Sequence, residues 1–352
     1  MGKRPLCLLD LVISEDLCNL RCKYCYSHDT LTIMKSQIKM EQYQISRVLD
    51  IVDIVCRSFD LAILKISGGE IFIYENIVDL IDIVSPLVPR VKIQTNGTLL
   101  NKDIVNEIGK YKNVGLQFTL DGHAWNMNSY RVSENLHKKL IENLNIILSI
   151  GIPTEINCCV HNRNIEQLLE YAEYIASLPG NPILNFIPVR NKERGLFFPD
   201  AIQSDVFEKL LNDDRLARVL PPKLFLQRIR QFISMKSKNY QYSCRLPGIT
   251  LGMNDFGIVK ACPFLETSEK MSLGNIFENG YDKVFSEVGA GKIHSLLKHP
   301  RLHPVACKEC FSDCEVIQMY VAGNYGEEEL KKYWFFNDEQ VLDILRKTKQ
   351  ST

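Results

Sequence analysis

The sequence has no excess charge of either sign. Lysine and arginine together number 42 among its 352 residues, and aspartate and glutamate also number 42. Binding to nucleic acid or to an anionic membrane surface depends on excess positive charge, so the composition supports neither partner. Long apolar runs are also missing, since none approaches the roughly 18 residues of a membrane span. Asp10, Glu15 and Asp16 interrupt any apolar core of a secretory signal, and these absences together predict a cytoplasmic protein.

Cysteine, by contrast, is abundant, with twelve residues in the chain. In a reducing compartment, cysteines are metal ligands or buried thiols more often than disulfides. Four of them, Cys7, Cys56, Cys158 and Cys159, lie in apolar runs, where a small core residue is the favoured interpretation. The other eight form one group near the N-terminus and one near the C-terminus.

The first group consists of Cys18, Cys22 and Cys25, with the spacing C-x3-C-x2-C and no fourth ligand nearby. Three thiolates can hold three irons of a [4Fe-4S] cube and leave the fourth iron open. An open iron can chelate a small molecule through an amine and a carboxylate. A structural zinc site would instead want a fourth protein ligand. Tyr24 and Tyr26 flank Cys25, and an aromatic ring there suits a cover for the cluster or a stacking partner for a ligand.

Up to about residue 190, short β-rich runs alternate with helical periodicity, as in Ile45, Val48, Val52 and Val55. This alternation predicts parallel strands joined by right-handed crossovers. Six units are too few for a complete eight-fold barrel. They suit a partial (β/α)6 barrel, although periodicity alone leaves a doubly wound sheet open. The candidate strands are Cys7–Ser14, Ala62–Ser67, Val91–Thr95, Gly115–Leu120, Thr154–Val160 and Ile183–Pro188.

The rest of the chain divides into three parts. Residues 191–240 are predicted to form a helical connector, with helices over Asp200–Leu211 and Lys223–Lys238 separated by Pro221-Pro222. Residues 241–325 form a cysteine-rich module punctuated by glycine and proline. The tail, residues 326–352, is predicted to be helical.

Polar residues follow several of the predicted strands, where parallel sheets and barrels place their active sites. The second strand runs into Ser67-Gly68-Gly69-Glu70, whose glycines allow a close backbone approach and whose carboxylate suits an α-ammonium group. The third and fourth strands end in Asn-Gly and Asp-Gly segments. Their side chains suit ribose hydroxyls or a substrate, although both dipeptides are also ordinary turn sequences. Arg131 suits a bidentate contact with a carboxylate, or a solvated surface position.

These motifs resemble the radical S-adenosylmethionine (radical SAM) superfamily. The cysteine triplet matches its cluster-binding motif, and Ser67 to Glu70 match its Gly-Gly-Glu motif. The resemblance implies a partial (β/α)6 barrel, a [4Fe-4S] cluster on Cys18, Cys22 and Cys25, and SAM on the open iron. One-electron reduction would then yield a 5′-deoxyadenosyl radical that abstracts hydrogen from a substrate. The predicted cofactor contacts are Tyr24, Ser67, Gly68, Gly69, Glu70, Thr95, Asn96, Thr119, Asp121, Arg131 and Asn157.

The second cysteine group resembles the SPASM/twitch extension of that superfamily, which carries one or two auxiliary iron–sulfur clusters. The shared features are C-x12-G-x4-C, formed with Gly257, and a later C-x2-C. Fewer cysteines are present than in the full SPASM pattern, so we expect at least one auxiliary cluster. A structural zinc site is the alternative. The predicted metal ligands of this module are Cys244, Cys262, Cys307, Cys310 and Cys314.

SPASM-type enzymes mostly modify peptides or proteins, so the resemblance implies a peptide or protein substrate. In sulfatase maturases, an aspartate that acts as a base occupies the position of Pro263. This difference favours a maturase of ribosomally made peptides. Its reaction would be cross-linking, epimerisation or thioether formation. With only about eight residues before the first strand, we expect no leader-binding domain there. A leader peptide, if there is one, would be recognised elsewhere.

Other functions remain open from the sequence. The alternative enzyme is a SPASM/twitch dehydrogenase acting on a protein side chain or on a small alcohol or sugar. A metal-bound interaction module without turnover is the non-enzymatic alternative. Reduced flavodoxin or ferredoxin is the electron donor that the resemblance implies. No catalytic acid or base is assigned, and the candidates are Tyr26, His28, His123, Asp121 and Cys314.

Overall fold

The computed structural model describes most of the chain. The described residues are 2–25, 27–189, 205–233, 248–260, 262, 272–288 and 313–351. Tyr26, Cys244, Pro263, Cys307 and Cys310 lie outside them, so predictions that fall on these residues are not addressed by the structure.

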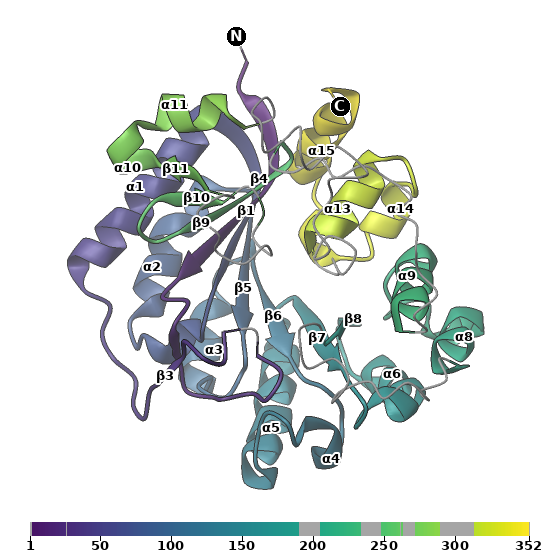
Figure 1. Ribbon diagram of the computed structural model, residues 1–352. Coiled ribbons are helices and arrows are strands. Elements are labelled where there is room, and N and C mark those ends of the chain that lie inside the picture. Colours follow the sequence, from purple (N-terminus) through teal and green to yellow (C-terminus); the bar gives the residue numbers. More distant parts are fainter. Residues whose placement is uncertain are drawn as a thin grey trace.

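Six parallel strands form the body of the molecule (Figure 1). They are β1 (Arg4–Ile13), β4 (Phe59–Gly68), β5 (Arg90–Thr95), β6 (Val114–Thr119), β7 (Thr154–Val160) and β8 (Ile183–Pro188). Neighbours in the sheet follow the order of the chain, and every pairing among the six is parallel. A doubly wound sheet would reverse its strand order at a switch point. The predicted partial (β/α)6 barrel is therefore confirmed.

Helices connect these strands and cover the outer face of the sheet. In α1, the residues Ile45, Val48 and Val52 recur at helical spacing and are buried. In α5, Ser133 caps the first turn by accepting a hydrogen bond from the backbone N–H of Leu136, the geometry expected of an N-cap serine. The helices are α1 (Gln42–Ser58), α2 (Ile77–Val84), α3 (Lys102–Ile108), α4 (Trp125–Asn128), α5 (Glu134–Ile150) and α6 (Leu168–Ser177), with short 3-10 turns at Ile71–Ile73, Ser85–Leu87 and Ile165–Gln167.

The cysteine-rich module adds three strands to the same sheet. Strand β9 (Thr250–Asn254) pairs with the free edge of β1 in the parallel sense, with Leu8 opposite Thr250. Strands β10 (Ile258–Lys260) and β11 (Ser272–Asn275) continue it in the antiparallel sense, which makes a nine-stranded sheet. Helices α10 (Ile276–Asn279), α11 (Tyr281–Ser286) and α13 (Asp313–Val321) follow. The module is thus joined to the barrel by backbone hydrogen bonds.

The connector contains helices where they were predicted, α8 (Asp205–Asn212) and α9 (Lys223–Ile233), with a 3-10 turn at Asp214–Leu216 between them. The tail forms α14 (Glu327–Leu330), a 3-10 turn at Trp334–Phe336, and α15 (Glu339–Ser351). In the described part of the chain, no helix is both long enough and apolar enough to cross a bilayer.

The tail packs against the amino end of the barrel. Phe335 is fully buried, and its ring lies 4.2 Å from the Lys92 ammonium inside the barrel. Lys92 in turn forms a 2.8 Å ion pair with Glu155, and both side chains are buried. Gln117 and Asn185 direct their amide groups toward the same carboxylate. The amino end is therefore closed by a paired charge and an aromatic ring.

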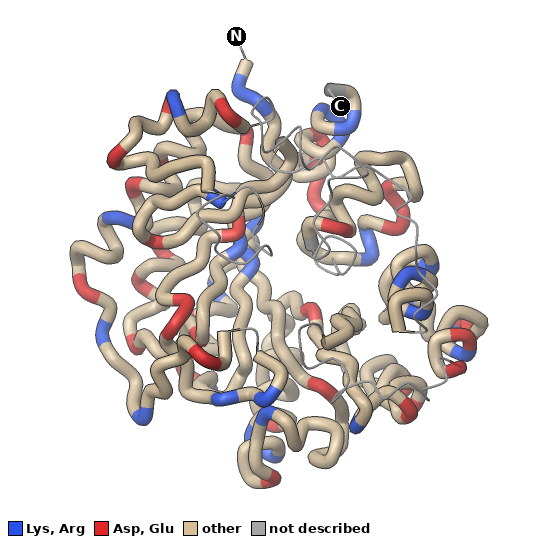
Figure 2. The backbone as a smooth tube through the Cα atoms, in the orientation of Figure 1, with Lys and Arg blue, Asp and Glu red and all other residues tan. Residues whose placement is uncertain are grey.

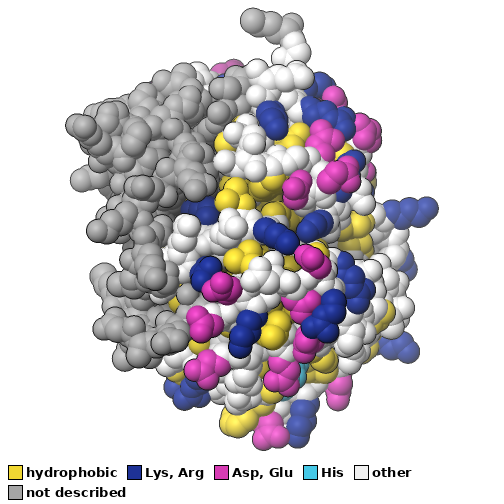
Figure 3. Space-filling view, turned by 90° about the vertical axis from the view of Figure 1, so that its right-hand side faces the viewer, with side chains coloured by type: hydrophobic (Ala, Val, Ile, Leu, Met, Phe, Trp, Pro, Cys, Tyr) yellow, Lys and Arg dark blue, Asp and Glu magenta, His cyan; other side chains and the backbone are white. Residues whose placement is uncertain are grey.

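Charges elsewhere are mixed. In the part of the chain that the structure describes, Figure 2 shows basic and acidic residues interspersed along the backbone. On the face shown in Figure 3, basic and acidic side chains alternate with small apolar areas. This distribution agrees with the absence of net charge in the sequence.

Candidate active site

The cysteine loop begins directly at the carboxyl end of β1. The chain turns at Ser14, a non-glycine residue with φ of 48°, and Leu17 N donates to Ser14 O at 3.1 Å. Cys18 then lies in the short strand β2 (Leu17–Cys18), which pairs with β3 (Thr32–Ile33). A turn joins the other two cysteines, with Cys25 N donating to Cys22 O at 3.1 Å. The loop therefore has defined backbone geometry at the rim of the barrel.

The three thiols lie close enough to affect one another. The pKa of Cys22 is raised to about 11, mainly by burial and in small part by negative charge on Cys25 and Cys18, while Arg131 opposes the rise. Burial also raises the pKa of Cys18, and charge on Cys25 adds to this. No group of three metal-ligating side chains in the described residues is arranged around a single ion. In a four-iron cube each thiolate binds a different iron, so three neighbouring thiols that do not surround a single ion fit such a cube.

The Gly-Gly pair lets the cysteine loop approach β4. A Cβ on Gly68 would lie 2.1 Å from Ile13 O, and one on Gly69 would lie 2.0 Å from Leu17 O. Neither distance is compatible with a side chain. The next residue continues this contact, since Glu70 N donates to Leu17 O at 2.8 Å. The glycines were predicted to allow a close approach of a ligand, and here they allow the backbone before Cys18 to lie on them.

Glu70 is held by three neutral donors. Its carboxylate accepts hydrogen bonds from Thr95 Oγ1 at 2.7 Å, from Asn96 N at 2.6 Å and from Phe72 N at 3.1 Å. Burial raises the pKa of Glu70, and these hydrogen bonds partly oppose that rise. The arrangement fixes the orientation of the carboxylate beside the cysteine loop. A carboxylate held in this way suits a cationic ligand group such as an ammonium.

Asp121 connects the cysteine loop to β6 and β7. The Tyr24 hydroxyl donates to Asp121 Oδ2, and Cys159 N donates to Asp121 Oδ1 at 2.9 Å. Arg131 is buried nearby and donates to Thr119 O at 2.8 Å. Burial by itself would lower the pKa of Arg131, but negative charge on Tyr24, Asp121 and Cys22 raises it above its usual value. The structure thus places Tyr24, Asp121 and Arg131 together beside Cys22.

Three other predicted contacts lie within strands of the barrel. The Ser67 hydroxyl donates to Asp10 Oδ1 at 2.6 Å, and both residues are buried. Asn157 is also buried and lies 3.5 Å from the Asn185 amide nitrogen. Thr119 is paired with Asn157 in the sheet. Their roles as cofactor contacts stay predictions.

The acid–base candidates have different surroundings. Asp121 is buried, and its carboxylate accepts hydrogen bonds from Tyr24 and from Cys159 N. His28 lies 3.2 Å from the exposed Asp29. His123 lies 3.2 Å from Glu170 and packs near Tyr171. The His28 backbone N–H donates to Cys25 O at 3.2 Å, but no described side-chain contact directs either imidazole toward the three thiols.

Two of the five predicted ligands of the auxiliary module are described. Cys262 follows β10 and is buried. Cys314 is buried at the start of α13, and Thr250 Oγ1 donates to its sulfur at 3.4 Å. The remaining predicted ligands, Cys244, Cys307 and Cys310, lie outside the described residues.

Two polar residues of the site were not predicted. Asn19 Nδ2 donates to Thr98 Oγ1 at 2.7 Å, and Asn19 Oδ1 accepts from Asn96 Nδ2 at 2.9 Å. Its position between Cys18 and Cys22 is the only feature of the sequence that could have indicated a role for Asn19. His161 was not predicted either, and its Nε2 lies 3.7 Å from Asp121 in the buried interior.

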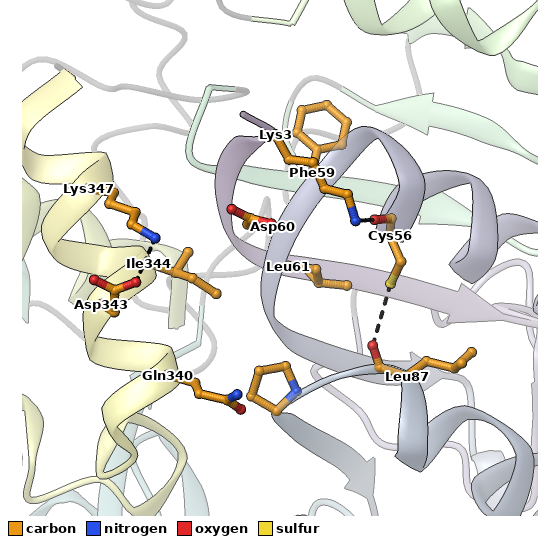
Figure 4. Close-up of a pocket in the computed structure, with 11 residues that line it drawn as sticks. Lys3, Cys56, Phe59, Asp60, Leu61, Leu87, Gln340, Asp343, Ile344 and Lys347 are labelled. Atoms are coloured by element: carbon orange, nitrogen blue, oxygen red, sulfur yellow. Dashed lines mark hydrogen bonds and ion pairs between the residues drawn. The ribbon is translucent and has the colours of Figure 1, made fainter. Parts of the chain in front are cut away.

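A pocket of about 360 Å³ lies at the opposite end of the barrel, between α15 and the start of β4 (Figure 4). Lys3 donates to Cys56 O at 2.7 Å, and Lys347 forms a 2.6 Å ion pair with Asp343. Since its charged groups pair with their neighbours and the cysteine loop is at the other rim, we do not assign the active site here.

A family model and several known proteins match this chain. Residues 12–175 match the model of the Radical SAM superfamily. The chain is 22% identical over 317 residues to the antilisterial bacteriocin subtilosin biosynthesis protein AlbA of Bacillus subtilis (strain 168), covering 88% of this chain and 65% of AlbA. It is 24% identical over 338 residues to the AdoMet-dependent heme synthase of Methanosarcina barkeri (strain Fusaro), covering 89% and 92% of the two chains.

Solved structures share the fold. The structure of native anSMEcpe with bound AdoMet and Cp18Cys peptide superposes with a TM-score of 0.62 at 17% identity, covering 98% of this chain and 99% of that one. Streptococcus suis SuiB bound to precursor peptide SuiA superposes with a TM-score of 0.60 at 15% identity, covering 92% and 74%. The segment that matches the Radical SAM superfamily model, residues 12–175, includes the cysteine loop and Glu70, and this segment is a radical SAM domain.

Proposed function

We propose that this protein is a radical SAM peptide maturase, acting on a ribosomally synthesised peptide. The observation that carries the proposal is the convergence of Cys18, Cys22 and Cys25 at the carboxyl rim, with Glu70 fixed beside them. A [4Fe-4S] cluster with SAM supplies reductive cleavage of SAM and hydrogen abstraction from the substrate when both are bound. Cross-linking, epimerisation and thioether formation would all begin with that abstraction.

The chain's own residues would position these cofactors. Cys18, Cys22 and Cys25 would hold the cluster, and Glu70 would bind the SAM ammonium through its oriented carboxylate. Arg131 is buried with its charge near Asp121 and Tyr24, so it can attract a carboxylate from the rim. Tyr24 and Asp121 would keep the cysteine loop in place against β6.

A peptide substrate is supported by the printed descriptions of the similar proteins. AlbA takes part in the biosynthesis of a bacteriocin, and anSMEcpe and SuiB were solved with bound peptides. These likenesses are below 25% identity, and the chain spans 65% of the length of AlbA. Substrate and partners are therefore part of the proposal, as are a flavodoxin- or ferredoxin-type electron donor and a cytoplasmic location.

We further propose at least one auxiliary iron–sulfur cluster, with Cys262 and Cys314 among its ligands. Both cysteines are buried in the module that joins the barrel through β9. A zinc site is the competing interpretation. Iron and sulfide beyond four of each per chain would support the auxiliary cluster, whereas zinc in this module would contradict it.

A second candidate is a dehydrogenase that acts on a protein side chain or a small molecule, and the likeness to an AdoMet-dependent heme synthase supports the small-molecule substrate. The separating experiment incubates anaerobically reconstituted protein with SAM, dithionite and short peptides encoded beside its gene. A maturase forms 5′-deoxyadenosine and a peptide of altered mass. Deoxyadenosine without any change in the peptides would contradict the peptide-maturase proposal. Cys262→Ala should still cleave SAM and lose the peptide product.

A further inference from the structure

The side-chain amide of Asn96 has a fixed orientation at the end of β5. Its Oδ1 accepts hydrogen bonds from Thr98 N at 2.9 Å and from Thr98 Oγ1 at 2.6 Å. The two ends of an asparagine amide are assigned from their partners, and both of these partners are donors. The amide nitrogen must therefore point the other way, toward Asn19 and Cys18.

That nitrogen reaches the sulfur of a predicted cluster ligand. Asn96 Nδ2 lies 3.8 Å from Cys18 Sγ and 2.9 Å from Asn19 Oδ1. An amide carries two N–H groups, so both contacts can be made together. Leu20 N also donates to Cys18 Sγ at 3.4 Å. Within the described residues, no side-chain amide donates to the sulfur of Cys22 or Cys25, which sets Cys18 apart.

The same residue holds the carboxylate of Glu70. Asn96 N donates to Glu70 Oε2 at 2.6 Å, and the preceding residue, Thr95, donates its hydroxyl to Oε1 at 2.7 Å. One residue therefore contacts both Cys18 and Glu70, the first through its side chain and the second through its backbone. Glu70 and Asn96 follow the carboxyl ends of two adjacent strands, β4 and β5, so the sheet brings them together.

We propose that Asn96 is a positioning residue that raises the reduction potential of the cluster by donating a hydrogen bond to the Cys18 thiolate. The inference rests on the proposed function, because it concerns the loaded protein. The step is the gain of one electron by the cluster from an external reductant, with no proton transferred. A hydrogen-bond donor stabilises the more negative, reduced state more than the oxidised one. The sequence had suggested Asn96 only as a cofactor or substrate contact.

Two variants of Asn96 separate an electronic role from a structural one. Asn96→Ala removes the donor and the acceptor of the turn together. Asn96→Asp keeps an oxygen for Thr98 N and Thr98 Oγ1, so it preserves the turn, but it cannot donate to Cys18. Asn106→Asp makes the same charge change at an exposed position of α3 and is the matched control.

The experiment is a redox titration of the anaerobically reconstituted full chain without SAM, followed by electron paramagnetic resonance. Asn96→Ala should lower the equilibrium constant for reduction about tenfold, which is about 59 mV toward more negative potential. Asn96→Asp should shift it in the same direction by at least as much, because it adds negative charge. Asn106→Asp should have the same reduction potential as the unsubstituted protein.

The outcomes are distinct. Full iron content with an unchanged potential in Asn96→Asp overturns this proposal and leaves the proposed function standing. Loss of iron from Asn96→Asp also overturns it, because Asn96 would then be structural. An unsubstituted protein that binds no four-iron cluster overturns the proposed function, and this inference with it.

Discussion

At the amino end of the barrel, a buried carboxylate is paired with a buried ammonium, whereas at the carboxyl rim a buried carboxylate is held by neutral donors. Glu155 lies 2.8 Å from Lys92, while Glu70 accepts from two backbone N–H groups and a hydroxyl. The first pair has no net charge, and Phe335 closes that end. The hydrogen-bond partners of Glu70 are neutral, and under the proposed function its carboxylate would bind the SAM ammonium. The two ends of one sheet thus hold their buried carboxylates in different ways.

The largest difference between the two ends concerns the thiols. Cys18→Ala removes a ligand at the rim and should abolish stable binding of the cluster, since three thiolates are already the minimum for this kind of site. Cys56→Ala, at the pocket of the amino end, is the control and should retain full iron content. Iron and sulfide analysis after anaerobic reconstitution measures both. Equal iron content in the two variants would contradict the assignment of Cys18 as a cluster ligand.

Removing one partner of the amino-end ion pair should destabilise the fold and spare the site. Lys92→Met leaves the Glu155 carboxylate without its buried cation, at a cost of about 3–5 kcal/mol. The double variant Lys92→Met/Glu155→Leu should lose much less, because no charge remains buried. Urea unfolding followed by circular dichroism gives both free energies of unfolding. A single variant as stable as the unsubstituted protein would contradict the structural role of this end.

Adding one methyl group between β4 and the cysteine loop should affect both the fold and the cluster. In Gly69→Ala the new Cβ would lie 2.0 Å from Leu17 O, so the loop must shift, at about 1–3 kcal/mol. The shift should also reduce the iron bound per chain. Gly2→Ala is the control, because nothing lies within 4 Å of a Cβ there. Unchanged iron content in Gly69→Ala would show that the close approach is not needed.

A helix cap away from both ends gives the smallest effect and a baseline. Ser133→Ala removes the hydrogen bond to Leu136 N at the start of α5, which should cost about 1 kcal/mol. Ser133→Asp keeps an acceptor and should retain the stability. Both variants should bind the cluster normally, as judged by iron content. Loss of iron in Ser133→Ala would show that general destabilisation, and not the rim itself, governs cluster binding.

The local parts of the fold could be predicted from the sequence. The β-rich runs and the helical spacing around Val48 and Val52 placed the barrel elements to within a few residues, because each pattern reflects burial within a single element. The pairing of β9 with β1 could not be predicted, since Leu8 and Thr250 are distant in sequence and β9 is short. The closing of the amino end by Phe335 is likewise a long-range contact.

The candidate site likewise has parts that the sequence predicts and parts that it does not. The cysteine spacing and Glu70 were visible because each is a short motif with its own chemistry. The link from Asn19 through Asn96 to Cys18 was not, because it depends on which way an amide points across adjacent elements. The Gly-Gly motif was noticed as a place of close approach, but the sequence does not say that the approaching group is the chain itself.

The most direct test of the central claim is formation of 5′-deoxyadenosine by the purified protein. The protein is reconstituted anaerobically with iron and sulfide, mixed with SAM and dithionite, and the nucleoside is measured by chromatography. We predict that the unsubstituted chain forms it only in the presence of reductant and that Cys18→Ala forms none. Deoxyadenosine at equal rates from both proteins, or from neither, would contradict the assignment of Cys18, Cys22 and Cys25 as the reactive site.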